Sequence, residues 1–308
     1  MSDVKPPGTA ETFSLFGEPL HQSPINLWLP SDETAYKEKM MELRANYELS
    51  LRNYLENPEE PEKLLWLGRR TGILGRFREA VALYSLGVQK FPSDPRFLRF
   101  RGHRFALLRR IDLAVADLEE AARLIKRRPD EPELYASGRP SKDKLGVSSF
   151  HWNVWYHLGF VYFAAGSLEK ATEAYRECMK VSDNPESVIA TTHWLYMVLK
   201  RIGKDDEAAG LLETIETRRQ VVEVGDYYET LLMYKGETSP EALLEKARSE
   251  GSVRFLTRGH AIGNLYLSVG ETERAIRIFR EVLATGQWTS GVYLLSEVEL
   301  KKLGVPPR

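Results

Sequence analysis

Four histidines, His103, His157, His193 and His260, are the side chains of this sequence best suited to metal binding or proton transfer. They fall on four different predicted helices, and no H-E-x-x-H pattern places two of them on one helical face beside a carboxylate. Histidine is also a common hydrogen-bonding residue on protein-binding surfaces. We therefore expect no metal site, no cofactor and no catalytic residue.

The single cysteine, Cys178, is the other candidate for chemistry, as a nucleophile. It matches Gly87 and Ala121 in the repeat described below, where small residues pack between helices, so we expect a buried thiol without catalytic function. The glycines of residues 68–72 lie inside a predicted helix rather than after a strand, which argues against a phosphate-binding loop. The sequence therefore predicts a protein that is not an enzyme.

Arginines gather in one stretch of the sequence. Residues 95–128 carry ten cations against four anions, a net charge of +6, in a chain whose formal net charge is −1. One basic patch in a neutral chain is a weak signal for nucleic-acid binding, which we do not expect. Arg96, Arg99 and His103 share one predicted helix face, where guanidinium groups could hold acidic side chains or a carboxyl terminus.

The elements that position these residues recur with a period of 34 residues. Ala80 and Ala114 are 34 positions apart, as are Gly68 and Gly102. Later copies of the pattern appear in residues 158–175, 199–212 and 263–279. Small residues recur where two helices must approach closely, and glycines such as Gly75, Gly166, Gly203 and Gly270 recur in the turn between them. Each copy therefore predicts two helices joined by a tight turn.

The copy that begins at Trp155 carries the most complete motif. It reads Trp155-Tyr156-His157-Leu158-Gly159-Phe160-Val161-Tyr162, followed by Ala171 and Tyr175. This pattern resembles that of the tetratricopeptide repeat (TPR) family over residues 61–289. The resemblance implies an all-α fold, a right-handed solenoid of helix-turn-helix repeats with capping helices. In this family the first helix of each repeat lines the inner face of the solenoid.

The resemblance and the breaks in the period give a domain plan. One break, of 23 residues, is rich in proline and glycine and predicts an irregular insertion. The plan is a flexible N-terminal tail (1–30), an N-terminal capping helix (31–57), two repeats (61–128), the insertion (129–151), four repeats (152–289), and a C-terminal capping helix and tail (290–308).

The predicted inner positions form the candidate binding groove. They are basic in the first two repeats and mainly aromatic in the later ones, and aromatic residues are enriched at binding hot spots. The aromatic residues could equally be core residues packed against neighbouring helices. The predicted groove consists of Arg69, Arg96, Arg99, His103, Tyr156, His157, Phe160, Phe163, His193, Trp194, Met197, Tyr227, Tyr228, His260 and Asn264.

The groove predicts a non-enzymatic scaffold that binds a peptide or a partner protein. The alternatives are a self-associating structural solenoid without an exchangeable ligand, and a small-molecule or metal receptor that uses the groove histidines. The apolar residues Phe13, Leu15, Phe16 and Leu20 of the tail could also fold back into the groove of the same chain or of a neighbour.

The composition is that of a folded, water-soluble protein. Hydrophobic residues make up 43% of the chain, and no apolar run approaches the roughly 18 residues of a membrane-spanning helix. The first 20 residues lack the apolar core of a secretory signal. We expect a cytoplasmic protein without membrane contact, or a periplasmic or secreted one if a leader has been removed.

Overall fold

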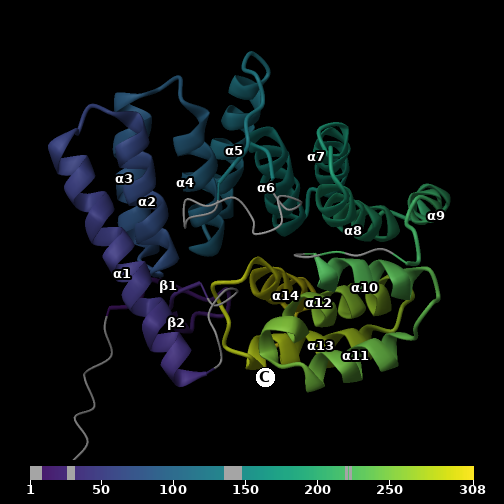
Figure 1. The fold of residues 1–308 in the computed structure, drawn as a ribbon. Coiled ribbons are helices and arrows are strands. Elements are labelled where there is room, and N and C mark those ends of the chain that lie inside the picture. The colour runs from purple at the N-terminus through teal and green to yellow at the C-terminus, as the bar shows by residue number, and fades with distance from the viewer. Residues whose placement is uncertain (1–8, 26–31, 135–147, 219–220, 222–223) are drawn as a thin grey trace, which may run out of the picture. The chain divides into compact units, whose positions relative to one another are not determined.

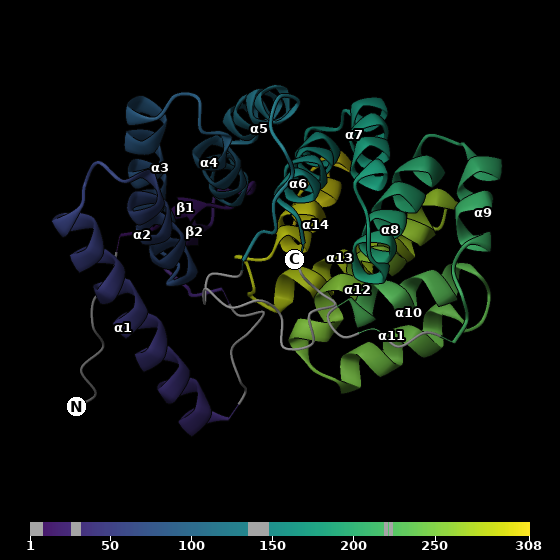
Figure 2. The same ribbon diagram turned by 45° about the horizontal axis from the view of Figure 1, so that its top comes forward.

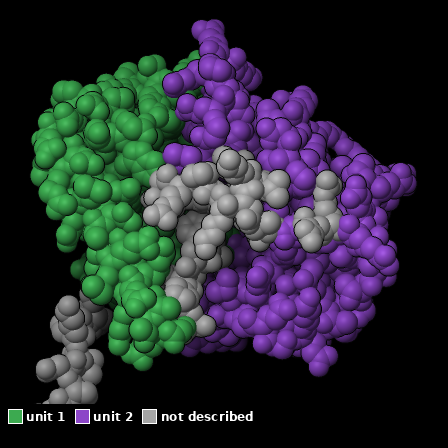
Figure 3. Space-filling model, in the orientation of Figure 1, with its two compact units in different colours: residues 1–124, 288–291 green, residues 125–287, 292–308 purple. Residues whose placement is uncertain are grey.

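The computed structural model describes residues 9–25, 32–134, 148–218, 221 and 224–308. Within these ranges it holds fourteen α-helices and one hairpin of two short strands (Figure 1). The predicted all-α fold of repeated helix pairs is confirmed. The chain forms two compact units, which we call unit 1 (residues 1–124 and 288–291) and unit 2 (residues 125–287 and 292–308) (Figure 3).

Unit 1 contains the hairpin, a long helix and two helix pairs. Asp32 caps the first helix, because its side-chain Oδ1 accepts a hydrogen bond from the Ala35 N–H at 2.8 Å. The last residue of α5 belongs to unit 2. The elements are β1 (Thr12–Phe13), β2 (Pro19–Leu20), α1 (Glu33–Glu56), α2 (Pro61–Ile73), α3 (Phe77–Lys90), α4 (Pro95–Leu107) and α5 (Ile111–Ile125).

Unit 2 contains four helix pairs and a closing helix, whose first residue belongs to unit 1. The elements are α6 (Phe150–Ala165), α7 (Leu168–Lys180), α8 (Pro185–Arg201), α9 (Asp205–Glu213), α10 (Gly225–Tyr234), α11 (Pro240–Ser249), α12 (Ser252–Ser268), α13 (Thr272–Ala284) and α14 (Gly291–Lys302).

The small residues of the first helices allow an aromatic side chain of the second helix to lie against the backbone. A Cβ atom added at Gly68 would lie 2.4 Å from the Tyr84 ring, and one added at Gly263 would lie 2.5 Å from the Phe279 ring. Real Cβ atoms do not approach other carbons so closely, so a larger residue would push the helices apart. The repeated glycines are thus a packing requirement in both units.

The turn between the two helices of a pair takes the left-handed conformation. The backbone φ is +76° at Gly75 and +78° at Gly166, a region that glycine adopts without steric cost. Arg109, 34 residues after Gly75, takes the same conformation with φ +62°. Its guanidinium lies over the Trp288 ring, 5.5 Å from the ring centroid. This contact gives a reason for a residue other than glycine at that turn.

Residues 9–25, within the segment expected to be a flexible tail, make defined contacts with helix ends of unit 1. Thr12 Oγ1 donates to the Leu108 carbonyl at 2.8 Å, and Gln22 Nε2 donates to the Leu74 carbonyl at 3.1 Å. Leu20 is buried, whereas Phe13 is 58% exposed. The segment therefore satisfies carbonyl groups at the C-terminal ends of α2 and α4.

Trp288 is buried in unit 1, although it lies far along the sequence from residues 1–124, which make up most of that unit. Its ring meets Phe77 edge-on with 5.5 Å between centroids, and its Nε1 donates to the His21 carbonyl at 3.0 Å. Trp288 thereby connects the hairpin segment to the helix pairs within unit 1.

The expected insertion begins and ends with paired backbone. Glu133 N donates to the Ser148 carbonyl, and Phe150 N donates to the Glu131 carbonyl, both at 2.7 Å. Residues 135–147 of this insertion lie outside the described residues. Among the described helices, none has the length and apolar character that crossing a bilayer requires.

Candidate functional site

The first helices of unit 2 bring the predicted aromatic residues together. Helix α8 contacts α6, α10 and also α12, which lies two repeats further along the sequence. Trp194 of α8 sits among them, with its ring centroid 6.3 Å from those of Phe163 and His260. Trp194 is only 2% exposed. The aromatic residues of α6, α8 and α12 therefore pack largely against one another.

Two tyrosines extend this cluster through hydrogen bonds. Trp194 Nε1 donates to the Tyr156 hydroxyl at 2.6 Å, and the hydroxyls of Tyr156 and Tyr227 are 2.9 Å apart. Burial raises the pKa of Tyr156 and of Tyr227, so both stay neutral phenols. Both residues are half-buried, as is His157. Of the predicted aromatic lining, Tyr156, His157 and Tyr227 therefore remain partly exposed to solvent.

His193 is buried in its neutral form. Its Nδ1 lies 2.7 Å from Thr230 Oγ1, and that hydroxyl donates its own proton to the Tyr227 carbonyl at 2.7 Å. Nδ1 must therefore carry the proton that it shares with Thr230. Burial lowers the pKa of His193 to about 3. A histidine held this way serves as a structural hydrogen-bond donor at neutral pH.

His260 of α12 is also buried in its neutral form, with the proton on Nδ1. Ser296 Oγ donates to the Val292 carbonyl, so it accepts from His260 Nδ1 at 3.0 Å. Asn264 Nδ2 then donates to His260 Nε2 at 2.9 Å. Burial, and then the charge that His193 would carry, lower the pKa of His260 to about 3. His260 is thus neutral too and joins α12 to the closing helix α14.

Asn264 continues this connection to α8. Its Oδ1 accepts from Arg201 Nη1 at 2.8 Å, and Arg201 Nη2 donates to Glu299 Oε2 at 3.0 Å. Glu299 is 1% exposed. The predicted groove residues His260 and Asn264 therefore belong to a buried polar chain across α8, α12 and α14.

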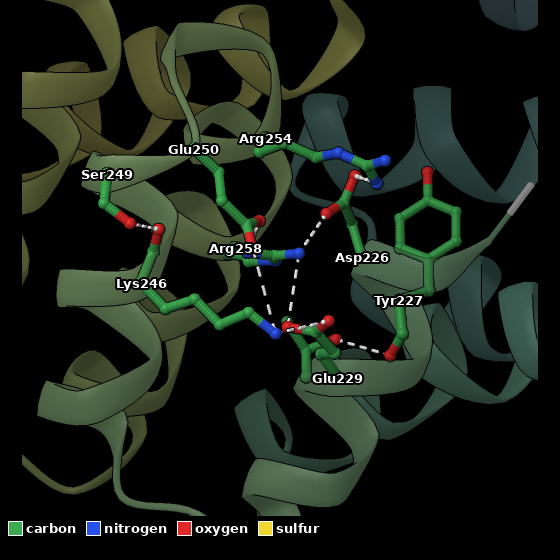
Figure 4. A network of polar contacts seen from close by, with 9 residues as sticks. Asp226, Tyr227, Glu229, Lys246, Ser249, Glu250, Arg254 and Arg258 are labelled. Carbon is green, nitrogen blue, oxygen red and sulfur yellow. Dashed lines mark hydrogen bonds and ion pairs between the residues drawn. The ribbon is translucent and has the colours of Figure 1, made fainter.

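A second polar cluster of unit 2, which the sequence did not indicate, centres on Arg258 (Figure 4). Its side chain is 2% exposed and pairs with Asp226 at 2.9 Å, Glu229 at 3.2 Å and Glu250 at 2.6 Å. Burial raises the pKa of Asp226, an effect that the charge of Arg258 opposes. The three carboxylates neutralise the buried guanidinium and join α10 and the end of α11 to α12.

Cys178 is fully buried in unit 2, where its Sγ lies 3.4 Å from Thr191 Oγ1. Burial raises the pKa of this thiol to about 12, so the reactive thiolate is scarce at neutral pH. The geometry favours a packing role.

The basic residues of unit 1 form a different kind of cluster. Arg69 of α2 lies over two rings, 4.4 Å from the Trp66 centroid and 4.7 Å from the Phe100 centroid. Arg99 of α4 lies over the same Phe100 ring at 4.2 Å. Two guanidinium groups thus share one ring between successive first helices. We call Trp66, Arg69, Arg99 and Phe100 the arginine–aromatic cluster.

The charge of Arg69 acts on its neighbour Arg70. The pKa of the neighbouring Arg70 is lowered, first by burial and then by the positive charge of Arg69. The sequence predicted the two arginines, whereas it did not single out Trp66 and Phe100, the rings that orient them. A search for aromatic residues one position or one helical turn from each arginine would have found both.

The two other basic positions predicted in unit 1 have different surroundings. Arg96 pairs with Asp94 at 2.7 Å and Glu62 at 2.6 Å, and these contacts raise its pKa. His103 Nδ1 lies 3.2 Å from Arg104 Nη1. The structure thus brings Arg69 and Arg99 together and gives Arg96 acidic partners.

The remaining predicted groove residues lie in unit 2. Phe160 is 6% exposed and Met197 is 3% exposed. Tyr228 is also buried, and its hydroxyl donates to the Glu216 carbonyl at 2.7 Å. The role of the unit 2 residues in binding stays a prediction, because most of their surface contacts the protein itself.

Comparisons with known proteins agree with the repeated helix pairs. Two models of the tetratricopeptide repeat match, one over residues 153–185 and the other over residues 260–293. These segments correspond to the pairs α6–α7 and α12–α13. No curated protein matches the chain.

Solved structures show limited similarity. MamA has a TM-score of 0.43 at 16% identity and is aligned over 68% of this chain and 98% of its own. YrrB, described as a TPR protein with an unusual peptide-binding site, has a TM-score of 0.43 at 13% identity, over 82% of this chain and 97% of its own. On the two repeat matches and the helix pairs that they cover, the chain contains tetratricopeptide repeats within residues 153–185 and 260–293.

Proposed function

We propose that the chain is a non-catalytic scaffold that binds an extended, acidic segment of a partner protein at the arginine–aromatic cluster of unit 1. Tetratricopeptide repeats support a role in protein interaction. The observation that carries the finer proposal is the pair Arg69 and Arg99 over one Phe100 ring.

Stacking on a ring suits a guanidinium to carboxylate recognition. The aromatic ring occupies the flat face of the group, while its N–H donors point outward in the plane of the guanidinium. A side chain already held in place loses less entropy when a ligand binds. Arg69 is 8% exposed and Arg99 is 5% exposed, so carboxylates of one partner segment would meet these two oriented cationic groups at the small part that remains accessible.

The charge pattern of unit 1 favours an acidic ligand over a basic one. The field of Arg69 already disfavours the protonated form of Arg70. A further positive charge from a ligand would add to this repulsion, whereas a carboxylate would relieve it. Trp66, which is half-buried, offers apolar contact next to the charges.

Fluorescence anisotropy tests the proposal. The probe is a labelled peptide of alternating glutamate and leucine with a free carboxyl terminus, and the control peptide has lysine in place of glutamate. We expect the full chain to bind the first and not the second. Replacing Arg69 and Arg99 by glutamine should weaken binding about tenfold or more, since charged hydrogen bonds are lost.

The matched control is Arg123→Gln. Arg123 lies on the second helix α5, is exposed, and pairs with Glu120. Its loss should leave peptide affinity unchanged, and circular dichroism should show that all variants keep their helices. Equal binding of both peptides, or equal affinity of the double variant and the control variant, would refute the proposal.

A further inference from the structure

Helix α1 exposes a stripe of residues that has no packing partner within the described part of unit 1. The buried residues of α1 are Leu43 and Ser50, seven positions apart, on the side turned toward α2. Met41 is 69% exposed and Leu55 is 67% exposed on the opposite side. In Figure 2, the side of α1 turned away from α2 carries no other helix of unit 1.

The exposed side has the spacing of a helix-pairing seam. Met41, Ala45, Glu48, Arg52 and Leu55 are all exposed and follow one another at intervals of four and three residues. That interval keeps side chains on one line of a helix that packs along another helix. We call these five residues the α1 stripe.

The stripe is apolar at its ends and charged in its middle. Glu48 and Arg52 are four residues apart, a distance at which they could pair within the helix. Among the described residues, however, neither forms an ion pair. Both charges therefore remain available for a partner.

We infer that the α1 stripe is the docking surface for a second copy of this chain, with the two α1 helices antiparallel. An antiparallel pair places Glu48 of each copy opposite Arg52 of the other. Leu55 of each copy then lies against Ala45 and Met41 of the other. The α1 stripe is thus complementary to itself when two copies are related by a twofold axis, the symmetry of most protein dimers.

The charge pattern selects this orientation. A parallel pair in register would set Glu48 against Glu48 and Arg52 against Arg52, and like charges across an interface oppose association. A single helix pair is a small interface, so association should depend on concentration. The α1 stripe and the arginine–aromatic cluster share no residue, so the two proposals can fail separately.

Sedimentation velocity of the full chain over a range of concentrations tests the inference through charge swaps. The wild-type chain should pass from monomer to dimer as the concentration rises. Glu48→Arg alone sets Arg against Arg, and Arg52→Glu alone sets Glu against Glu, so each should weaken dimerisation about tenfold or more. The double variant Glu48→Arg/Arg52→Glu restores opposite charges and should dimerise like the wild type.

Two further variants separate this surface from others. Met41→Glu places a charge at the apolar end of the stripe and should also weaken dimerisation, while Val269→Glu, at another exposed apolar residue, should not. Peptide binding should be the same in the wild type and all five variants. The inference is overturned if the wild type stays monomeric throughout, if the single swaps dimerise normally, or if the double variant fails to recover.

Discussion

In unit 1, Arg69 and Arg99 lie over aromatic rings, whereas in unit 2, Arg258 pairs with three carboxylates. All three arginines are buried and lie on the first helix of a helix pair. A buried charge that is matched by acids holds its own helices together. A guanidinium that lies over a ring is oriented by that ring.

The same difference appears in the inner-face residues. Helix α8 of unit 2 contacts α12 as well as its direct neighbours, so His193, Trp194 and His260 meet one another and bury their polar atoms in internal hydrogen bonds. Equivalent positions of the repeat therefore have different surroundings in the two units: guanidinium groups over rings in unit 1, and internal hydrogen bonds between buried side chains in unit 2.

We expect the largest change in the free energy of unfolding from replacing Arg258. Its replacement by methionine leaves Asp226, Glu229 and Glu250 without their shared cation, and breaking a buried ion pair costs about 3–5 kcal/mol. Urea unfolding should show this loss. Arg254→Met, which removes a half-exposed partner of Asp226, should cost no more than about 1 kcal/mol. Similar small losses for both would mean that Arg258 does not hold unit 2 together.

The two units share glycines at which a ring packs against the helix backbone, and substitution of these glycines should cause the second-largest loss of stability. Gly68→Ala in unit 1 and Gly263→Ala in unit 2 each place a methyl group against a buried ring, and overpacking of this kind costs about 1–3 kcal/mol. Gly210→Ala in α9 meets no atom within 4 Å and should be neutral or stabilising. Thermal unfolding measures all three. A harmless Gly263→Ala would contradict the close helix approach described for unit 2.

The buried histidines make unit 2 sensitive to acid. Their folded-state pKa is about 3, against about 6.5 for an unfolded histidine. Between these values only the unfolded chain binds the proton, so the free energy of unfolding falls as the pH falls from 6.5 toward 3. Each histidine contributes up to about 1.4 kcal/mol per pH unit in that window.

His193→Asn isolates one of these contributions. The asparagine amide can still donate to Thr230, but it does not titrate. The variant should therefore lose less stability than the wild type between pH 6.5 and 4, as measured by urea unfolding at each pH. An identical pH dependence would show that His193 is not a buried neutral residue.

The repeat pattern predicted most of the fold because each glycine and alanine reports one close contact between two helices. Gly159 and Gly263, for example, accept the rings of Tyr175 and Phe279 from the second helix. The site was harder to predict. Sequence spacing places a residue on a helix face, but it does not show whether two such faces meet, as α8 and α12 do. It also missed the Arg258 cluster, whose acids come from two segments, α10 and the end of α11.

The most direct test of a recognition surface in unit 1 is hydrogen–deuterium exchange of the full chain with and without the glutamate–leucine peptide. We expect slower exchange in α2 and α4, around Arg69 and Arg99, and unchanged exchange in α6, α8 and α12. Protection confined to α6, α8 or α12, with α2 and α4 unaffected, would contradict this expectation.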